Sequence, residues 1–226
     1  MHILVKLTLI LPLKQFDCYE YFKYWNNMQL NFRKIILGSG SPRRKQLLEE
    51  IGLEFEIIIP AGEENYEVDL TPELAILKIA KAKNIEIQNF LGQKIEVEKP
   101  IIITADTMVI IGDQSLGKAK DDQEAAKYLQ MLSGQTHEVI TGHLVFDSKN
   151  NQYFSKAISS KVTFKTLSQK EIADYVATGE TQGKAGAYAG QGIGGKFISN
   201  FEGDYPSFVG ISKNYIYETL SGLLGE

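Results

Sequence analysis

Apolar residues along the chain occur in short runs that alternate with segments of helical spacing, and this alternation begins at Arg33. Such alternation is typical of a mixed α/β fold whose functional groups lie on connecting loops. The apolar runs predict strands at residues 34–38, 54–60, 100–111, 136–147 and 152–166. The last two predict a hairpin, because the polar residues 149–151 separate them.

The predicted helices are marked by capping residues or prolines at their starts and by glycines near their ends. Ser168 and Glu171, for example, have the spacing of a capping box. The helices are expected at residues 41–51, 71–90, 122–132, 168–179 and 213–224. Residues 112–115 predict a turn, and the six glycines from Gly183 to Gly195 predict a loop that wraps closely around a ligand.

Residues 1–33 precede this pattern, and we expect them to be an extension outside the folded domain, which we place at residues 34–226. The apolar run from Ile3 to Leu13 is too short to cross a membrane. It also lacks the small-residue cleavage site of a signal peptide. We therefore expect a natural start at Met28, or an extension without an export role, and no membrane partner.

Composition argues against several function classes. The formal net charge of −4 disfavours binding of a nucleic acid polymer, because proteins that neutralise many phosphates usually carry a basic surplus. The single cysteine, Cys18, excludes an internal disulfide and a zinc site of several thiolates, and it fits a cytoplasmic protein. With only three histidines, a metal would be held by carboxylates, which favours magnesium or manganese.

The first candidate site is the turn into the first helix, residues 38–44. Its small residues allow a tight turn, the helix start presents free N–H groups, and Arg43 and Arg44 add bidentate donors. A polyphosphate could bind there, although a plain capped helix with two solvated arginines has the same spacing. The segment is not a Walker loop, because the Gly-Lys-Ser/Thr ending is absent.

The second candidate is Asp106, a carboxylate in the middle of the apolar strand at 100–111. Burial of an unpaired carboxylate is costly, so Asp106 requires a metal, a cation or several hydrogen-bond donors, and the last of these would be a structural role. Acids in the loop after the second strand could complete a metal site, although most such runs are solvated. They are Glu63, Glu64, Glu67 and Asp69. Lysines that could neutralise a triphosphate are Lys78, Lys81, Lys83, Lys118 and Lys120.

Four ordered motifs, taken together, resemble the Maf family of nucleotide pyrophosphatases. They are Ile36-Leu37-Gly38-Ser39-Gly40-Ser41-Pro42-Arg43-Arg44, Thr104-Ala105-Asp106-Thr107-Met108-Val109, Leu132-Ser133-Gly134-Gln135-Thr136-His137-Glu138-Val139 and Lys184-Ala185-Gly186-Ala187-Tyr188-Ala189-Gly190-Gln191-Gly192. The resemblance is collinear from about Lys34 to Leu220. It implies an elongated mixed α/β fold with a central sheet, flanking helices and two lobes around a cleft. It also implies hydrolysis of a modified or pyrimidine nucleoside triphosphate to the monophosphate and pyrophosphate.

By position, Asp106 matches the catalytic acid of that family. Residues at its phosphate-, metal- or base-contacting positions are Ser39, Arg43, Glu64, Lys83, Lys118 and Gln191. Residues at positions that separate a dTTP/UTP branch from a 7-methyl-GTP branch are Arg44, Thr107 and Gln191, and this chain resembles the dTTP/UTP branch. Two departures are Gly190, which replaces a common apolar residue and is expected to loosen base discrimination, and the missing proline in Gly210-Ile211-Ser212, which affects the lead-in to the last helix.

The resemblance implies that Asp106 and Glu64 hold magnesium or manganese on the phosphates, while Arg43, Lys83 and Lys118 stabilise the leaving pyrophosphate. Asp106, directly or through the metal, would activate a water for attack on the α-phosphorus. Two other functions stay open: a non-catalytic nucleotide-binding regulator of cell division, and a nucleotidyltransferase that needs an acceptor. A homodimer is also an open alternative.

Overall fold

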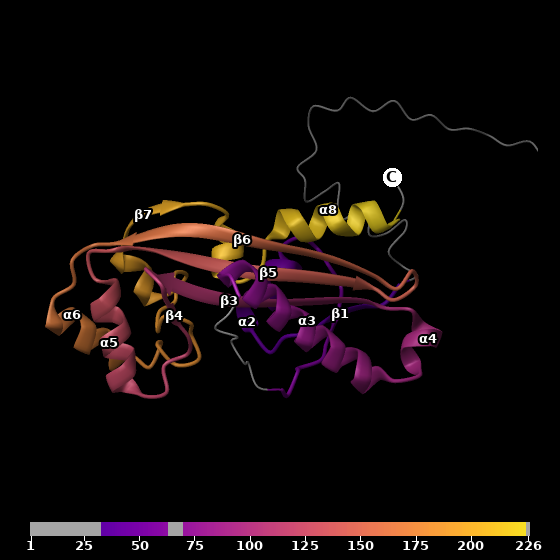
Figure 1. Ribbon diagram of the computed structural model, residues 1–226, viewed down its shortest axis with the longest axis horizontal. Coiled ribbons are helices and arrows are strands. Elements are labelled where there is room, and N and C mark those ends of the chain that lie inside the picture. Colours follow the sequence, from indigo (N-terminus) through magenta and orange to yellow (C-terminus); the bar gives the residue numbers. More distant parts are fainter. Residues whose placement is uncertain (1–32, 63–69, 225–226) are drawn as a thin grey trace, which may run out of the picture.

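The computed structural model describes residues 33–62 and 70–224, and it confirms the predicted mixed α/β class. The strands are β1 (Ile35–Leu37), β2 (Glu56–Ile57), β3 (Ile101–Ile111), β4 (Gln114–Leu116), β5 (Thr136–Asp147), β6 (Gln152–Phe164) and β7 (Ile198–Glu202). They form one seven-stranded sheet in the order β2-β1-β3-β5-β6-β7, with β4 paired to β3. β1 is parallel to both β2 and β3, and the other pairs are antiparallel. The long strands β3, β5 and β6 run along the elongated molecule (Figure 1).

Helices flank both faces of this sheet. They are α2 (Pro42–Glu49), α3 (Pro72–Leu91), α4 (Lys94–Glu98), α5 (Asp122–Leu132), α6 (Gln169–Val176), α7 (Tyr205–Val209), α8 (Lys213–Leu224) and the 3-10 helix η2 (Ile193–Phe197). Figure 1 shows α3, α4 and α8 at one end of the long axis and α5 and α6 at the other. In the described ranges, no helix combines the length and the apolar character needed to cross a membrane.

The side chains of β3 alternate between two cores, and this alternation decides where its acid points. Ile101 and Ile103 belong to the core shared with α5, α6 and α8. Ile102 and Met108 pack instead in the two clusters to which α3 contributes. Asp106 has the same parity as Ile102 and Met108, so its carboxylate lies on the α3 face of the sheet.

α3 approaches the sheet closely beside Asp106, because the β5 residue paired with this acid is Gly142. A Cβ on Gly142 would lie 2.9 Å from the backbone carbon and oxygen of Ile76 in α3, a contact that real side chains do not make. Thr104, two residues before the acid, donates to the carbonyl oxygen of Ala80 at 2.8 Å. Together these contacts fix the helix over the part of β3 that carries the acid.

Most predicted elements are confirmed, and the differences at their ends have local causes. The first helix ends at Glu49 rather than at residue 51, because Gly52 has a φ of 73° and Leu53 turns back to donate to Leu48. The second predicted strand is wrong in length: only β2 pairs with β1 within residues 54–60. Pro60 at its far end has no N–H to donate.

Three further boundaries differ from the prediction. The predicted turn at 112–115 is shorter, because Gln114 and Ser115 pair with β3 as part of β4. The strand expected to reach residue 166 ends at Phe164, where the pairing with β7 shifts register. The helix predicted to extend to Gly179 ends at Val176, and tighter backbone bonds form the following turn.

Short elements were absent from the prediction altogether, namely α4, β4, η2, β7 and α7. The glycine-rich segment 183–195, expected to be irregular throughout, ends in the first residues of η2. Arg33, assigned to the extension, donates to the carbonyl of Lys99 and pairs with the buried Asp147. Residues 1–32 lie outside the described residues, so the domain boundary stays a prediction.

Candidate active site

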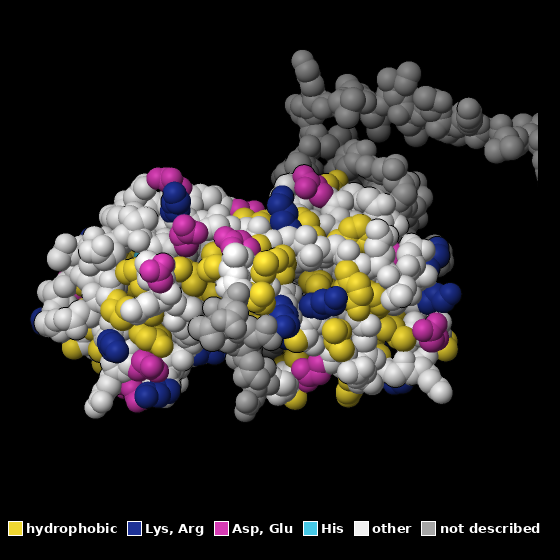
Figure 2. Space-filling model, in the orientation of Figure 1, with side chains coloured by type: hydrophobic (Ala, Val, Ile, Leu, Met, Phe, Trp, Pro, Cys, Tyr) yellow, Lys and Arg dark blue, Asp and Glu magenta, His cyan; other side chains and the backbone are white. Residues whose placement is uncertain are grey.

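A cleft of about 450 Å³ lies between the two ends of the molecule. The β1–α2 turn, α3 and residues 208–210 line one side, where Val209 and Gly210 accept hydrogen bonds from Arg43 and Arg44, and residues within 183–191 line the other. Every predicted site residue that the structure describes lines this cleft, namely Ser39, Arg43, Arg44, Lys83, Asp106, Thr107, Lys118 and Gln191. In the space-filling view, the lower edge of the molecule is indented between the α5 end and the α3 end, and basic side chains lie beside the indentation (Figure 2).

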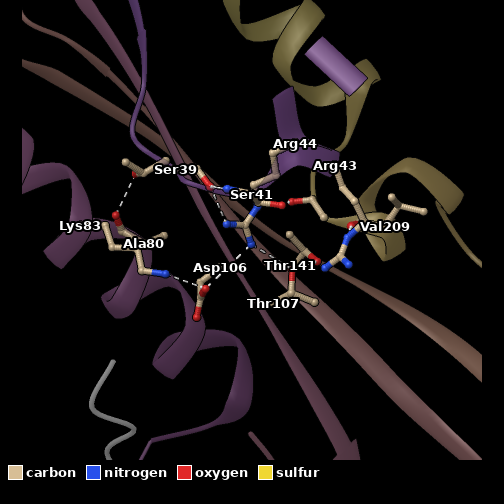
Figure 3. A network of polar contacts seen from close by, with 12 residues as sticks. Ser39, Ser41, Arg43, Arg44, Ala80, Lys83, Asp106, Thr107, Thr141 and Val209 are labelled. Carbon is tan, nitrogen blue, oxygen red and sulfur yellow. Dashed lines mark hydrogen bonds and ion pairs between the residues drawn. The ribbon is translucent and has the colours of Figure 1, made fainter. Parts of the chain in front are cut away.

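Asp106 is the acid among the described residues of the cleft, and it is only 5% exposed. Lys83 reaches it from α3, with 2.7 Å between Nζ and Oδ1. Figure 3 shows the lysine pointing from the helix toward the strand. Of the three partners expected for this buried carboxylate, namely a metal, a cation or several hydrogen-bond donors, the structure thus shows a cation.

Arg44 connects the β1–α2 turn to the acid. Its guanidinium donates to Ser39 Oγ at 3.1 Å, to Thr107 Oγ1 at 3.3 Å and to the carbonyl of Gly210 at 2.9 Å. Nη2 also lies 3.8 Å from Asp106 Oδ1. Because Arg44 is buried and bonded in several directions, it fixes the relative positions of the turn, β3 and the segment after α7.

Arg43 points away from its neighbour, toward Val209 (Figure 3). Its Nε donates to the carbonyl of Val209 at 3.3 Å. Burial, followed by the nearby positive charge of Arg44, lowers the pKa of Arg43 from its ordinary value. The two arginines thus differ. Arg44 bonds Ser39, Thr107 and Gly210 within the protein, whereas Arg43 bonds a carbonyl oxygen at the cleft and is suited to bind an incoming anion.

The β1–α2 turn has the predicted strand–turn–helix form, but its capping differs from expectation. Ser41 is at the N-cap without a side-chain hydrogen bond to the helix. Its own N–H instead donates to Ser39 Oγ at 3.2 Å, and Pro42 occupies the first turn. Because the Ser41 side chain leaves the first-turn N–H groups of α2 uncapped, they are suited to binding phosphate oxygens.

Lys118 and the glycine-rich segment lie together on the opposite side. Lys118 forms an isolated antiparallel bridge with Ala185, and the N–H of Gly186 donates to the carbonyls of Leu116 and Gly117. Of the other candidate lysines, Lys78, Lys81 and Lys120 do not line the cleft. Lys118 and Lys83 thus approach the cleft from different elements.

Gln191 is exposed at the cleft, at the end of the glycine-rich segment. Tyr188, three residues earlier, is buried, and its hydroxyl lies 2.8 Å from Nε2 of His137. Burial lowers the pKa of His137 to about 4, so this ring is neutral at pH 7. The loop prediction is confirmed to this extent: a glycine-rich segment, anchored by Tyr188, presents a polar side chain to the cleft.

The Gly190 departure has a structural explanation. A Cβ at this position would lie 2.1 Å from Cε1 and 2.2 Å from Cζ of Phe208, which also lines the cleft. The Phe208 ring therefore fills the space that a side chain at 190 would need. The expectation of looser base discrimination has no support in this geometry and stays a prediction.

The second departure, the missing proline in Gly210-Ile211-Ser212, lies directly before α8, where Ser212 makes several hydrogen bonds. The N–H of Ser212 donates to Nε2 of His143 at 2.8 Å, which a proline could not do. Its Oγ donates to Asp204 and accepts from the N–H of Tyr215, as a helix cap does. Ser212 thus fixes the start of α8, and the effect of the missing proline stays a prediction.

Sequence reasoning missed several residues that shape the cleft. Phe208 and Lys184 line it directly, and Gly142 sets the approach of α3. Tyr175 and Glu180 bond to the backbone of the glycine-rich segment. In the sequence, Tyr175 and Glu180 are marked only as a tyrosine near the end of a predicted helix and an acid that follows it. This pattern is too unspecific to indicate their role.

One carboxylate oxygen of Asp106 is available to a further ligand. Oδ2 is buried and has no hydrogen-bond partner among the residues that the structure describes. A buried oxygen without a donor is uncommon, and it fits a hard divalent cation bound by one or two carboxylates and by substrate phosphates. The described ranges hold no group of three or more His, Cys, Asp or Glu suited to a metal, and Glu64 lies outside them.

The fold and cleft define a mixed α/β protein that combines a helix start without a side-chain cap from Ser41, several cations and one buried carboxylate. The family described as Maf-like protein matches residues 34–223, and the chain belongs to this family.

Relatives of known name support this membership. The chain is 40% identical over 191 residues to the dTTP/UTP pyrophosphatase of Ruminiclostridium cellulolyticum. The aligned region covers 84% of this chain and 96% of that protein. It is 38% identical over 188 residues to the enzyme of the same name from Desulforamulus reducens, covering 83% and 95%. It is 40% identical over 178 residues to that of Bacillus pumilus, covering 79% and 90%.

Proposed function

We propose that the chain is a nucleoside triphosphate pyrophosphatase that hydrolyses dTTP and UTP to the monophosphate and pyrophosphate. The observation that carries this proposal is the buried Asp106 carboxylate, with one oxygen bonded to Lys83 and the other without a donor among the described residues. A carboxylate in this state is suited to orient a water or to hold a cation beside a phosphate. The names of the relatives at 38–40% identity supply the substrate.

The phosphates would lie along the cationic residues of the cleft. The first-turn N–H groups of α2 and the Arg43 guanidinium would bind phosphate oxygens, because both are preorganised donors. Lys83 and Lys118 would stabilise charge that develops on the leaving pyrophosphate. Arg44, bonded to Ser39, Thr107 and Gly210, would keep the phosphate-binding turn in register with the acid.

Asp106 would supply the catalytic carboxylate. Arg44 and Lys83 hold it in position from two sides, so the carboxylate is already oriented before substrate arrives. Oδ2 would accept a proton from, or align, the water that attacks the α-phosphorus. Gln191 would contact the base at the other end of the cleft. Thr107 accepts a hydrogen bond from Arg44, and these two residues would together influence which substrate is accepted.

A divalent cation, magnesium or manganese, fits this site as a proposed cofactor. Asp106 Oδ2 would be one ligand, Glu64 is the proposed second, and the remaining ligands would be phosphate oxygens and water. When bound, the ion would neutralise phosphate charge and acidify a water. The other residues of the site act by binding, orienting and charge compensation.

One experiment separates this proposal from its rivals. The protein is incubated with a panel of nucleoside triphosphates and magnesium, without any acceptor, and monophosphate and pyrophosphate are quantified. Equimolar release of both from dTTP and UTP supports the pyrophosphatase. Tight binding without turnover would indicate a nucleotide-binding regulator, and release of pyrophosphate only after an acceptor is added would indicate a nucleotidyltransferase.

A further inference from the structure

Glu180, just beyond the end of α6, binds the backbone of the glycine-rich segment. Its Oε1 accepts from the N–H of Ile193 at 3.0 Å, and its Oε2 accepts from the N–H of Gly194 at 2.9 Å. The carboxylate therefore spans two successive donors at the start of η2. Charge-assisted hydrogen bonds of this kind are stronger than neutral ones, so they hold the backbone firmly.

Tyr175 on α6 completes this arrangement from inside the core. Its ring is fully buried and packs edge-on against Phe197, with centroids 5.0 Å apart. Its hydroxyl donates to Glu180 Oε2 at 2.8 Å and accepts from the N–H of Ala189 at 3.1 Å. The two side chains thus bind the chain two residues before Gln191 and two and three residues after it.

We propose that Tyr175 and Glu180 are positioning residues that fix Gln191 at the base-binding end of the cleft. This inference rests on the proposed function, because it assigns to Gln191 a contact with the base. Neither residue lines the cleft, so both act through the backbone that carries Gln191. We name the pair the backbone clamp.

The local sequence explains why a clamp is needed. Residues 189–192 lie outside any helix or strand and include Gly190 and Gly192, so their conformational freedom in the absence of other contacts is large. Gly192 is also required by the clamp itself, because a Cβ there would lie 1.9 Å from Glu180 Oε1. An ordered base contact at Gln191 therefore depends on bonds from outside the segment.

The charge of Glu180 also faces the cations of the cleft. Burial and then Arg43 lower the pKa of Lys184, while the carboxylate of Glu180 acts against this decrease. Glu180 likewise opposes the decrease in the pKa of Arg43 that burial and Arg44 cause. The Glu180 carboxylate, which bonds the segment that carries Gln191, thus also favours the charged forms of Arg43 and Lys184.

The test compares two conservative variants with a matched control. Tyr175→Phe keeps the buried ring but removes the hydroxyl, and Glu180→Gln keeps the shape but removes the charge. Glu171→Gln is the control. Glu171 lies on α6, as Tyr175 does, but it bonds Ser168 and Lys165 and makes none of the clamp's bonds to residues 189–194. Each protein is assayed with dTTP, UTP, dCTP and ATP, and amide hydrogen exchange of residues 186–197 is measured.

Both clamp variants should raise KM for dTTP roughly tenfold, as expected for loss of one or two hydrogen bonds, some of them charge-assisted, with a smaller change in kcat. The preference for dTTP over dCTP and ATP should fall, and amides of residues 189–194 should exchange faster. Glu171→Gln should lower thermal stability without changing KM, base preference or exchange in this segment. A clamp variant that folds and retains the base preference and KM of the wild type would overturn the proposal.

Failure of the proposed function gives a different result. If the wild type hydrolyses none of the triphosphates, the function is wrong, and the clamp is then tested with a non-hydrolysable α,β-methylene analogue of dTTP. Affinity for the analogue should decrease in both clamp variants but not in Glu171→Gln. If Tyr175→Phe does not fold, Glu180→Gln alone decides, because this side chain is only partly buried. Unchanged affinity and exchange in Glu180→Gln would contradict the inference.

Discussion

The two sides of the cleft are held in place by different means. On the acid-bearing side, α3 packs on β3 and β5, Lys83 hydrogen-bonds Asp106, and Arg44 forms a longer ion pair with it. On the glycine-rich side, residues 183–192 form no helix or strand; Tyr175 bonds the backbone of Ala189, and Glu180 bonds the backbone just after them, at Ile193 and Gly194. The first side is therefore fixed by packing of regular elements, and the second by hydrogen bonds to a loop.

This difference matches what each side must do. Stabilisation of developing charge depends on donors that are already in position within a site of low dielectric, so the acid-bearing side benefits from rigid elements. Discrimination between bases depends on a few polar contacts, and a loop can change these without disturbing the sheet. Changes on the acid-bearing side should therefore affect kcat, and changes on the glycine-rich side should affect KM and base preference.

Asp106→Asn tests the acid-bearing side with the largest expected effect. The variant keeps the shape of the side chain but removes the charge, so kcat for dTTP should fall by at least about 100-fold, the usual contribution of a general base. Pyrophosphate release measures the change, and circular dichroism checks the fold. Asp113→Asn, in the exposed β3–β4 turn, is the control and should retain activity. Substantial turnover by Asp106→Asn would show that the carboxylate is not catalytic.

Gly142→Ala tests whether close packing of α3 positions Lys83. The new Cβ would lie 2.9 Å from the backbone of Ile76, so the helix must move. Such overpacking costs about 1–3 kcal/mol of unfolding free energy, and kcat should decrease because Lys83 moves with the helix. Urea unfolding and steady-state kinetics measure both. Gly222→Ala in α8, where the new Cβ has no atom within 4 Å, should lose no stability. Equal behaviour of the two variants would contradict this account.

Gly190→Ala tests the opposite side. Its Cβ would meet the Phe208 ring at 2.1 Å, so the ring or the segment must shift. We expect KM for dTTP to rise several-fold, with kcat less affected, because the strain lies beside Gln191. Phe208→Val should relieve the clash, so the double variant should recover part of the affinity lost by Gly190→Ala. A double-mutant cycle measures this coupling, and strictly additive effects would show that the contact has no influence on binding.

Lowering the pH should have a smaller effect than these substitutions. It should decrease the unfolding free energy of the whole domain and not of one side of the cleft in particular. Burial lowers the pKa of His137 and of His143 to about 4, below their ordinary value of 6.5. Between these values the unfolded chain binds more protons, so the unfolding free energy decreases as pH falls from 6.5 toward 4. At pH 6 the loss should be less than about 1 kcal/mol for each ring. Urea unfolding at several pH values measures the slope, which His143→Gln should reduce; an unchanged slope would contradict this cause.

Much of the acid-bearing side could be predicted from sequence, because its residues lie in regular elements with clear local signals. The apolar run around Asp106 indicated a buried strand, and a buried acid needs a metal, a cation or several hydrogen-bond donors. Thr71 and Pro72 marked the start of the helix that carries Lys83. The sequence pattern does not predict the distance between β3 and α3. This distance depends on the pairing of Asp106 in β3 with Gly142 in the neighbouring strand β5.

The glycine-rich side was predictable only as a loop. Six glycines indicate a backbone with large conformational freedom. The conformation that this backbone adopts is determined by side chains distant in sequence. Tyr175 reaches Ala189 across 14 positions, and Phe208 fills the space beside Gly190. These contacts arise from tertiary packing, which local spacing does not encode. Glu64, the predicted metal ligand, lies outside the described residues, so its role stays a prediction.

The central claim is that a water in the Asp106 cleft attacks the α-phosphorus of dTTP. Turnover in water enriched in heavy oxygen tests it directly, because the attacked phosphorus keeps the oxygen of the water. Mass spectrometry of the products should show the label in dTMP and none in pyrophosphate. Label in pyrophosphate, or release of inorganic phosphate in place of pyrophosphate, would contradict the account.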